Sequence, residues 1–257
     1  MTTVPKKALG QHFLVDRNLL GVIGRLADLE PADVVLEVGP GLGVLTDYLA
    51  SRVRHVHAVE LDRSLEEPLR DALAAHENVA LIFGDGLALD VGVLDPGPNK
   101  LVANLPYNVA TPIVVETVIG APGLVRWCVM VQREVADRFF AVPSTKAYGA
   151  VSVLLRLGTR RVGFHAVPPS AFRPPPKVES AIVAFERSDG PDLALVRPVV
   201  TGAFAHRRKT LANSLALAGV ASREDAVEAL AAVGVRPDAR AEQLEPQDFV
   251  ALAEALL

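Results

Sequence analysis

The sequence predicts an α/β protein, in which a largely parallel sheet is covered by helices on both faces and followed by a small all-helical region. Short apolar runs alternate with helical patterns from residue 34 to residue 140, and this alternation is typical of a parallel sheet. Beyond residue 191 only helical patterns follow. The 257 residues, half of them hydrophobic, are enough for one large domain with a small partner domain.

Five strands are expected in the first region, each a short apolar run that ends near a glycine or a polar side chain. They cover residues 34–38, 56–59, 79–83, 101–103 and 125–131. Uniformly apolar runs of this length are consistent with strands that are buried on both faces. Helices are expected after the loop that ends at Gly43 and over residues 65–75, 112–119 and 134–140.

The next segment changes in character. Residues 151–167 are predicted as a strand interrupted by Gly158, and residues 178–185 as a further strand. Residues 168–177 are too rich in proline for a helix or a central strand.

A linker is predicted at residues 188–191, which gives a domain of residues 1–187 and a helical domain of residues 188–257. Helical periodicity is evident around residues 199–204 and 249–256. Ser222 with Asp225 resembles a capping box, and Gly234 is expected to end the helix that it begins.

The distribution of charge indicates an anionic partner. The net charge is -4, and residues 1–150 hold 13 basic and 18 acidic side chains. Residues 144–210 instead hold 11 basic and 4 acidic ones. A basic zone on an acidic protein is typical of nucleic-acid binding, although a solvated face has the same pattern.

Cysteine content and hydropathy favour the cytoplasm. The single cysteine, Cys128, excludes a disulfide within one chain. No run reaches the roughly 18 apolar residues of a membrane helix, and no apolar stretch follows Lys6 and Lys7, so neither a membrane segment nor a secretory signal is expected.

His55 and His57 have no third ligand nearby in the sequence, and no metal site is predicted.

The first three expected strands end in groups that suit a nucleoside-like ligand. The loop at residues 39–43 places glycines before a helix, where a ligand can approach the backbone. Glu60 follows the second strand and can accept hydrogen bonds from ribose hydroxyls, and Asp85 follows the third and can accept from an adenine amino group. Each alone is usually a cap or a solvated end. In this order they indicate an S-adenosylmethionine site.

The fourth expected strand leads into Asn104, Leu105, Pro106 and Tyr107. The amide and the nearby carbonyls can accept hydrogen bonds from an exocyclic amino group, and the tyrosine offers a flat face for a base. A tight turn after a strand would have the same sequence. Together with the preceding strand ends, this segment predicts a pocket for adenine.

At this point the chain resembles a known family, the ribosomal small-subunit adenine dimethyltransferases or KsgA family. The matching residues span most of the sequence: 7–14, 37–43, 60–62, 104–108, 146–149, 172–178 with 180–181, and 207–210 with 213–215. The resemblance implies a Rossmann-like class I methyltransferase sheet of seven strands, the last antiparallel, with a small helical carboxyl-terminal domain. It implies transfer of two methyl groups from S-adenosylmethionine to N6 of each of two adjacent adenines near the 3′ end of the 16S ribosomal RNA.

Site residues follow from the resemblance by position. Cofactor contacts are expected at His12, Leu14, Gly39, Gly41, Glu60, Asp85 and Asn104. The family often has asparagine in place of His12 and alanine in place of Gly86, and the glycine is expected to loosen the adenine pocket slightly.

The expected mechanism depends on positioning, because methyl transfer from a sulfonium is an in-line displacement. The Asn104 side chain and the Leu105 or Pro106 carbonyl would hold the adenine amino group, with Tyr107 on one face of the base and Phe172 on the other. Phe172 could instead be a core residue beside the proline-rich turn.

RNA phosphates are the expected partners of seven basic residues, namely Arg156, Arg160, Arg161, Lys177, Arg207, Arg208 and Lys209. For Arg207 to Lys209, stabilisation of a helix end is the alternative.

Three alternative functions remain open. The first is a large-subunit adenine dimethyltransferase that confers macrolide-type resistance, which usually carries isoleucine where Leu105 stands. The second is a mainly non-catalytic checkpoint factor of small-subunit assembly. The third, a DNA adenine methyltransferase, is disfavoured because that group typically has a second proline at that position. The partner expected is the small ribosomal subunit, without a membrane, and the protein is expected to be a monomer.

Overall fold

The computed structural model describes residues 11–256, and these form two compact units. The first unit comprises residues 11–136 and 161–187, and the second comprises residues 137–160 and 188–256. The segment 137–160 therefore belongs with the carboxyl-terminal helices. The boundary between the two units at residues 187 and 188 coincides with the start of the predicted linker.

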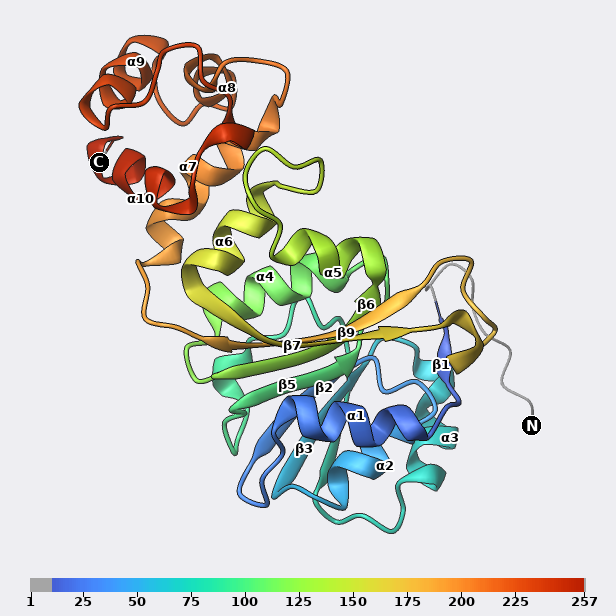
Figure 1. Cartoon of the computed structure of the whole chain (residues 1–257). Coiled ribbons are helices and arrows are strands. Elements are labelled where there is room, and N and C mark those ends of the chain that lie inside the picture. Colours follow the sequence, from blue (N-terminus) through green and yellow to red (C-terminus); the bar gives the residue numbers. More distant parts are fainter. Residues whose placement is uncertain (1–10, 257) are drawn as a thin grey trace. The chain divides into compact units, whose positions relative to one another are not determined.

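A seven-stranded sheet forms the centre of the first unit (Figure 1). Its order is β4-β3-β2-β5-β6-β9-β7. The strands are β2 (Val34–Val38), β3 (His55–Glu60), β4 (Val79–Phe83), β5 (Lys100–Asn104), β6 (Arg126–Gln132), β7 (Thr159–Val167) and β9 (Ser180–Arg187). The first five pair in parallel, and β9 pairs antiparallel with β6. The predicted sheet, parallel with an antiparallel last strand, is confirmed.

Helices and a second, two-stranded sheet complete the first unit. The helices of this unit are α1 (Asn18–Ala27), α2 (Val44–Ala50), α3 (Glu66–Ala72), α4 (Ala110–Gly120) and the first half of α5 (Arg133–Phe139), whose last residues belong to the second unit. Short 3-10 turns lie at η2 (Arg63–Leu65), η3 (Val91–Val93) and η4 (Pro169–Ala171). The small sheet joins β1 (Phe13–Leu14) to β8 (Phe172–Arg173) in antiparallel register. Helix α1 and this small sheet are absent from the expectations drawn from sequence.

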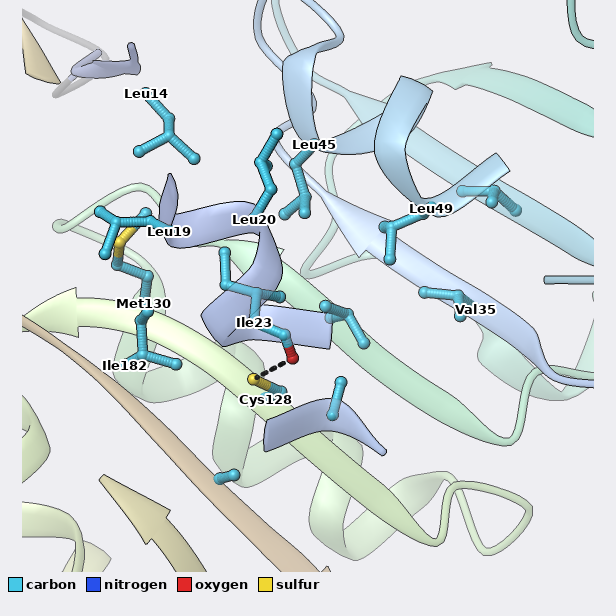
Figure 2. Packing of buried hydrophobic residues seen from close by; sticks show 14 of the residues in the cluster. Leu14, Leu19, Leu20, Ile23, Val35, Leu45, Leu49, Cys128, Met130 and Ile182 are labelled. Carbon is cyan, nitrogen blue, oxygen red and sulfur yellow. Dashed lines mark hydrogen bonds between the residues drawn. The ribbon is translucent and has the colours of Figure 1, made fainter. Parts of the chain in front are cut away.

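Two neighbouring residues of β6 show how the helices cover the sheet. Successive side chains of a strand point to opposite faces. The Cys128 thiol donates a weak hydrogen bond to the Ile23 carbonyl of α1 at 3.8 Å, within the main hydrophobic core (Figure 2). The adjacent Trp127 donates from its indole nitrogen to the Thr117 hydroxyl of α4 at 3.0 Å. Helices α1 and α4 therefore lie on opposite faces, as an α/β sheet requires.

The segment predicted as one strand over residues 151–167 is wrong in its first half. Residues Ala150–Gly158 form helix α6, and β7 begins only at Thr159. The buried side chains of α6 include Val153, Leu154 and Leu157, whose three- and four-residue spacing is that of a helix. A short apolar run can be read either way, and here tertiary packing decides.

Helices and buried aromatic rings form the second unit. Besides α6 it contains α7 (Leu193–Ala205), α8 (Leu211–Leu217), α9 (Arg223–Ala232), the 3-10 turn η5 (Ala241–Gln243) and α10 (Pro246–Leu256). Tyr148 is fully buried, donates its hydroxyl hydrogen to the Leu244 carbonyl at 2.9 Å, and packs edge-on against Phe204. The Ser222 hydroxyl accepts from the Asp225 N–H at 3.0 Å, which confirms the predicted cap of α9.

None of the described helices is both long enough and apolar enough to cross a membrane.

A buried polar network ties the amino-terminal ends of β2 and β5 together. The Lys100 ammonium lies 2.8 Å from an oxygen of Asp33, and both side chains are at most 8% exposed. Asn99 donates to the other Asp33 oxygen at 2.8 Å and accepts from the Val34 N–H at 2.9 Å. Lys100 also donates to the Asp28 carbonyl. Each charge is thus paired and hydrogen-bonded, which is what makes a buried ion pair tolerable.

Candidate active site

A cavity opens at the carboxyl-terminal ends of β2, β3, β4 and β5, within the first unit. Its empty volume is about 1050 Å³, which includes the solvent at its mouth. Its walls contain all seven residues predicted as cofactor contacts, namely His12, Leu14, Gly39, Gly41, Glu60, Asp85 and Asn104, and also Leu105, Pro106 and Tyr107. The four strand ends thus meet at one site, as the rule for open parallel sheets predicts.

The glycine loop between β2 and α2 takes a conformation that other residues rarely adopt. Gly39 and Gly41 have φ values of 79° and 60°. A Cβ atom at Gly39 would lie 3.2 Å from the ring of Pro106, and one at Gly41 would lie 3.0 Å from the ring of Phe13. Two independent reasons therefore require glycine at both positions: the backbone angle and the close approach of a neighbouring ring each exclude a side chain.

Glu60 is held in place by the loop that it faces. One carboxylate oxygen accepts from the Gly41 N–H at 3.1 Å, and the other accepts from the Asp62 N–H at 2.9 Å. Burial raises the pKa of Glu60, and the two backbone hydrogen bonds oppose part of that rise. Each oxygen keeps a second lone pair. The carboxylate is therefore fixed in a position from which it can accept hydrogen bonds from a diol.

Glu37 is a site residue that the sequence reasoning missed. It lies in β2, lines the cavity and is 1% exposed, and one of its oxygens has no hydrogen-bond partner in the described part of the chain. Burial raises the pKa of Glu37 to about 8, with Thr46 lowering it in part and the charge of Glu60 raising it further. An acidic residue inside a run of valines and leucine was a usable signal, because burying an unpaired carboxyl is costly.

Asp85 is exposed at the mouth of the cavity, where one of its oxygens accepts from the Leu87 N–H at 2.9 Å. The neighbouring Gly86 does not leave the gap that was expected. A Cβ atom at this position would lie 2.6 Å from a methyl carbon of Val38. Val38 therefore occupies the space that an alanine would take, and the expectation of a looser pocket is wrong.

The end of β5 presents the Asn104 amide to the cavity, and the segment after it presents an aromatic ring. Asn104 donates from Nδ2 to the His12 carbonyl at 3.1 Å. Leu105 is 1% exposed, and its N–H donates to the Met130 carbonyl at 3.1 Å. The Tyr107 hydroxyl lies 2.5 Å from the Ser180 hydroxyl oxygen. Burial raises the pKa of Tyr107, so the phenol stays neutral and acts through its ring and its hydrogen bond.

Phe172 is the one predicted catalytic residue that does not line this cavity. It is 1% exposed, belongs to the main hydrophobic core and lies opposite Leu14 in the β1–β8 pairing. A ring packed in this way has no free face for a base. Its core role is the alternative that the sequence left open, and its stacking role stays a prediction that requires the ring to leave the core.

Replacing Phe172 with leucine is expected to lower the free energy of unfolding by roughly 1–3 kcal/mol, because the smaller side chain leaves core space unfilled. Urea denaturation checks this value. If the melting temperature is unchanged while methyl transfer is lost, the ring acts on the substrate and the core role is contradicted. Phe164, which is half-buried on β7, supplies the matched control Phe164→Leu, from which we expect a smaller loss.

The seven predicted RNA-binding residues divide between the units. Arg161 and Lys177 are exposed on the first unit, and Arg160, Arg208 and Lys209 are exposed on the second. Arg207 donates to the Tyr148 carbonyl at 3.1 Å, and Arg156 lies 3.7 Å from an oxygen of Glu245. Arg156 lies on α6 rather than on the expected strand.

Metal ligands do not gather anywhere within residues 11–256, where no three histidine, cysteine or acidic side chains could hold an ion together. His55 and His57 lie side by side on β3 with ring centroids 4.5 Å apart. His57 also hydrogen-bonds through Nε2 to the Pro96 carbonyl at 2.8 Å. The pair is thus packed into the fold near the loop before β5.

Comparison with known proteins gives one family and a set of close relatives. The family model described as ribosomal RNA adenine dimethylase matches residues 4–257. The protein named ribosomal RNA small subunit methyltransferase A from Rubrobacter xylanophilus is 49% identical over 253 residues, which cover 98% of this chain and 95% of that protein. The protein of the same name from Geobacter metallireducens is 42% identical, with 98% and 95% covered.

Solved structures share the fold over nearly the whole chain. A dimethyladenosine transferase from Plasmodium falciparum has a TM-score of 0.78 at 22% identity, with 94% of this chain and 96% of that chain covered. The 23S rRNA methyltransferase ErmE has a TM-score of 0.66 at 29% identity, with 95% and 99% covered. At these identities the first structure supports the fold, and the second extends the likeness to an enzyme that acts on a different ribosomal RNA.

Proposed function

Because the chain belongs to the ribosomal RNA adenine dimethylase family, we propose that it dimethylates N6 of two adjacent adenines near the 3′ end of the 16S ribosomal RNA. The methyl donor is S-adenosylmethionine. The observation that carries the proposal is the single cavity in which the glycine loop, Glu60 and Asp85 face the segment Asn104–Tyr107. Relatives at 49% and 42% identity that are named for the small subunit support the choice of RNA.

The residues of the cavity fit S-adenosylmethionine. The buried Glu37 oxygen without a partner calls for a donor or a positive charge, which the methionine end of such a ligand carries. The fixed carboxylate of Glu60 suits the ribose hydroxyls, and the exposed Asp85 suits the adenine amino group. The glycine loop permits close approach of the ligand to the backbone.

The methyl donor supplies an electrophilic methyl group on a positively charged sulfur. The protein's part is to hold the amino group of the target adenine in line with it, which is mainly a matter of position. Asn104 offers an amide oxygen as acceptor. The Pro106 carbonyl already accepts from the Val109 N–H at 3.1 Å, so the Leu105 carbonyl is the better second acceptor. Two acceptors draw the amino nitrogen toward a tetrahedral geometry, in which its lone pair is free to attack.

The choice between ribosomal subunits is tested by incubating the protein with labelled methyl donor and separate small and large subunits from cells that lack the modification. We expect label in N6,N6-dimethyladenine of the 16S RNA alone. Label in the large-subunit RNA would instead favour the resistance enzyme, to which the likeness to ErmE at 29% identity points.

We also propose that the chain acts as a monomer in the cytoplasm and that residues 188–257 form a helical domain for RNA and ribosome binding. Exposed Arg208 and Lys209 of the second unit support the RNA-binding role. The buried single cysteine suits a reducing compartment. The molar mass of the purified protein, measured by light scattering with and without small subunits, tests whether the protein is a monomer.

Replacing Arg208 and Lys209 with glutamate is expected to weaken binding to the small subunit and to make that binding less dependent on salt. The slope of the logarithm of the binding constant against the logarithm of the salt concentration should fall in magnitude by about 0.7–0.9 for each phosphate that is no longer neutralised. Arg207 is left unchanged because it supports Tyr148. The control is Arg25→Glu with Arg70→Glu, which changes the net charge equally at exposed positions of the first unit. Equal weakening by both pairs would mean that net charge alone acts.

A further inference from the structure

We propose that His12 is a positioning residue for the reaction. Its main-chain carbonyl sets the orientation of the Asn104 amide, and its ring holds that carbonyl in place. The inference rests on the proposed function, in which Asn104 accepts a hydrogen bond from the substrate amino group. It differs from the cofactor contact that the family resemblance implies for His12.

The orientation of the Asn104 amide follows from its partner. Nδ2 of Asn104 lies 3.1 Å from the His12 carbonyl oxygen. A carbonyl oxygen can only accept a hydrogen bond, so the NH₂ end of the amide must face it. The oxygen end then faces the other way, and no hydrogen bond to that oxygen is found within residues 11–256.

This orientation decides whether the amide helps or hinders the reaction. The adenine amino group reaches the site as a donor, and the outward Asn104 oxygen matches it. If the amide were turned over, its NH₂ end would meet the amino group, and two donors would face each other. The His12 carbonyl thus excludes the unproductive orientation before the substrate arrives.

The side chain of His12 fixes the position of that carbonyl. Nδ1 donates to the Pro174 carbonyl at 2.7 Å. The ring also stacks on Tyr107 with centroids 5.3 Å apart and planes inclined by 29°. Tyr107 is held in turn by Ser180. One imidazole therefore links the amino-terminal segment, the proline-rich turn and the base-binding segment.

Apart from the ring, the carbonyl is restrained through its neighbours, and before it the Gln11 side chain donates to an Asp62 oxygen at 3.1 Å. The strand that follows it, β1, has only two residues, and its partner β8 is equally short. Loss of the ring would let the His12 carbonyl shift, and with it the Asn104 amide. A misplacement of about 1 Å can lower turnover by about a hundredfold, even when the displaced group does not touch the reacting atoms.

The test compares His12→Ala with His12→Asn, whose amide can still donate to the Pro174 carbonyl. At saturating RNA and methyl donor, we expect His12→Ala to lower turnover by about tenfold to a hundredfold, while the dissociation constant of S-adenosylmethionine, measured by calorimetry, changes by less than about threefold. His12→Asn should recover most of the turnover. Native turnover at saturation, together with a dissociation constant raised well beyond threefold, would overturn the proposal in favour of a cofactor contact.

A double-mutant cycle separates positioning from general support of the fold. If His12 acts through Asn104, adding His12→Ala to Asn104→Ala should cause no further loss of turnover. An additive loss would overturn the proposal. Should His12→Ala fail to fold, His12→Phe keeps a ring against Tyr107 without the donor and enters the same cycle.

The outcome distinguishes this inference from the proposed function. Methylation of 16S adenines by the wild type, lost in Asn104→Ala, supports the proposed function whatever His12 does. Unchanged turnover in His12→Ala under those conditions overturns only the inference. Failure of the wild type to methylate the small-subunit RNA overturns the proposed function and the inference with it.

Discussion

Asn104→Ala should lower methyl transfer to small-subunit RNA by about a hundredfold or more, the size of effect seen when one preorganised hydrogen bond to a reacting centre is removed. The substitution removes the oxygen that faces the substrate, together with the Nδ2 donor to the His12 carbonyl. The affinity for S-adenosylmethionine should stay within a few-fold of the wild type, because Glu37, Glu60 and the glycine loop remain. Single-turnover kinetics with labelled donor, beside calorimetric binding, measures both quantities.

Two further variants sharpen this prediction. Asn104→Asp keeps an acceptor but cannot donate to the His12 carbonyl, so we expect turnover to fall here as well. Asn18→Ala, at an exposed position at the start of α1, is the control and should be fully active. Native turnover in Asn104→Ala would exclude the mechanism proposed for the amide. Retained binding of the inactive variant to small subunits would allow its role in assembly to be measured apart from catalysis.

Lys100→Met is expected to lower the free energy of unfolding by about 3–5 kcal/mol, since it leaves the buried Asp33 carboxylate without its charged partner. The remaining bond from Asn99 compensates for only part of that loss. Urea denaturation followed by circular dichroism measures the effect. Lys100 begins β5 and Asn104 ends it, about 13 Å along the strand, so methyl transfer by the folded fraction should be unaffected.

The matched control for Lys100 is an exposed ion pair. Arg70→Met breaks the pair with Glu66, whose side chains are 60% and 38% exposed, and it should cost less than about 1 kcal/mol. Combining Lys100→Met with Asp33→Asn should cost less than the sum of the single changes, because no unpaired charge is then buried. Equal effects of Lys100→Met and Arg70→Met would contradict the role given to the buried network.

The parts of the molecule that were predictable are those set by local pattern. Strands β2 to β6 follow from short apolar runs, and the carboxyl-terminal ends of the first four, β2 to β5, carry the residues that line the cavity. Because all parallel strands point the same way, the ends of separate runs must meet at one edge of the sheet. The positions of Glu60, Asp85 and Asn104 around one cavity were therefore accessible without coordinates.

The parts that were missed depend on contacts between distant residues. The pairing of Phe13 with Arg173 joins segments 160 positions apart, and two-residue strands leave no periodic signal. The sequence predicts a strand where helix α6 lies, because a largely apolar run of nine residues fits both periods. The burial of Phe172 and the bond between His12 and Asn104 likewise arise only when the amino-terminal segment docks.

The pairing of β1 with β8 sets an order for the completion of the cavity during translation. The strands β2 to β6 can assemble as they are made, but residues 13–14 in the cavity wall have no strand to pair with until residues 172–173 have been added. At about 5–20 residues per second, that delay is roughly 8–30 s. A nascent chain that stalls before this point would hold four strand ends and the glycine loop, yet the Pro174 carbonyl that fixes the His12 ring would still be missing. Competence for methyl transfer is thus gained late, after about two thirds of the polypeptide has been synthesised.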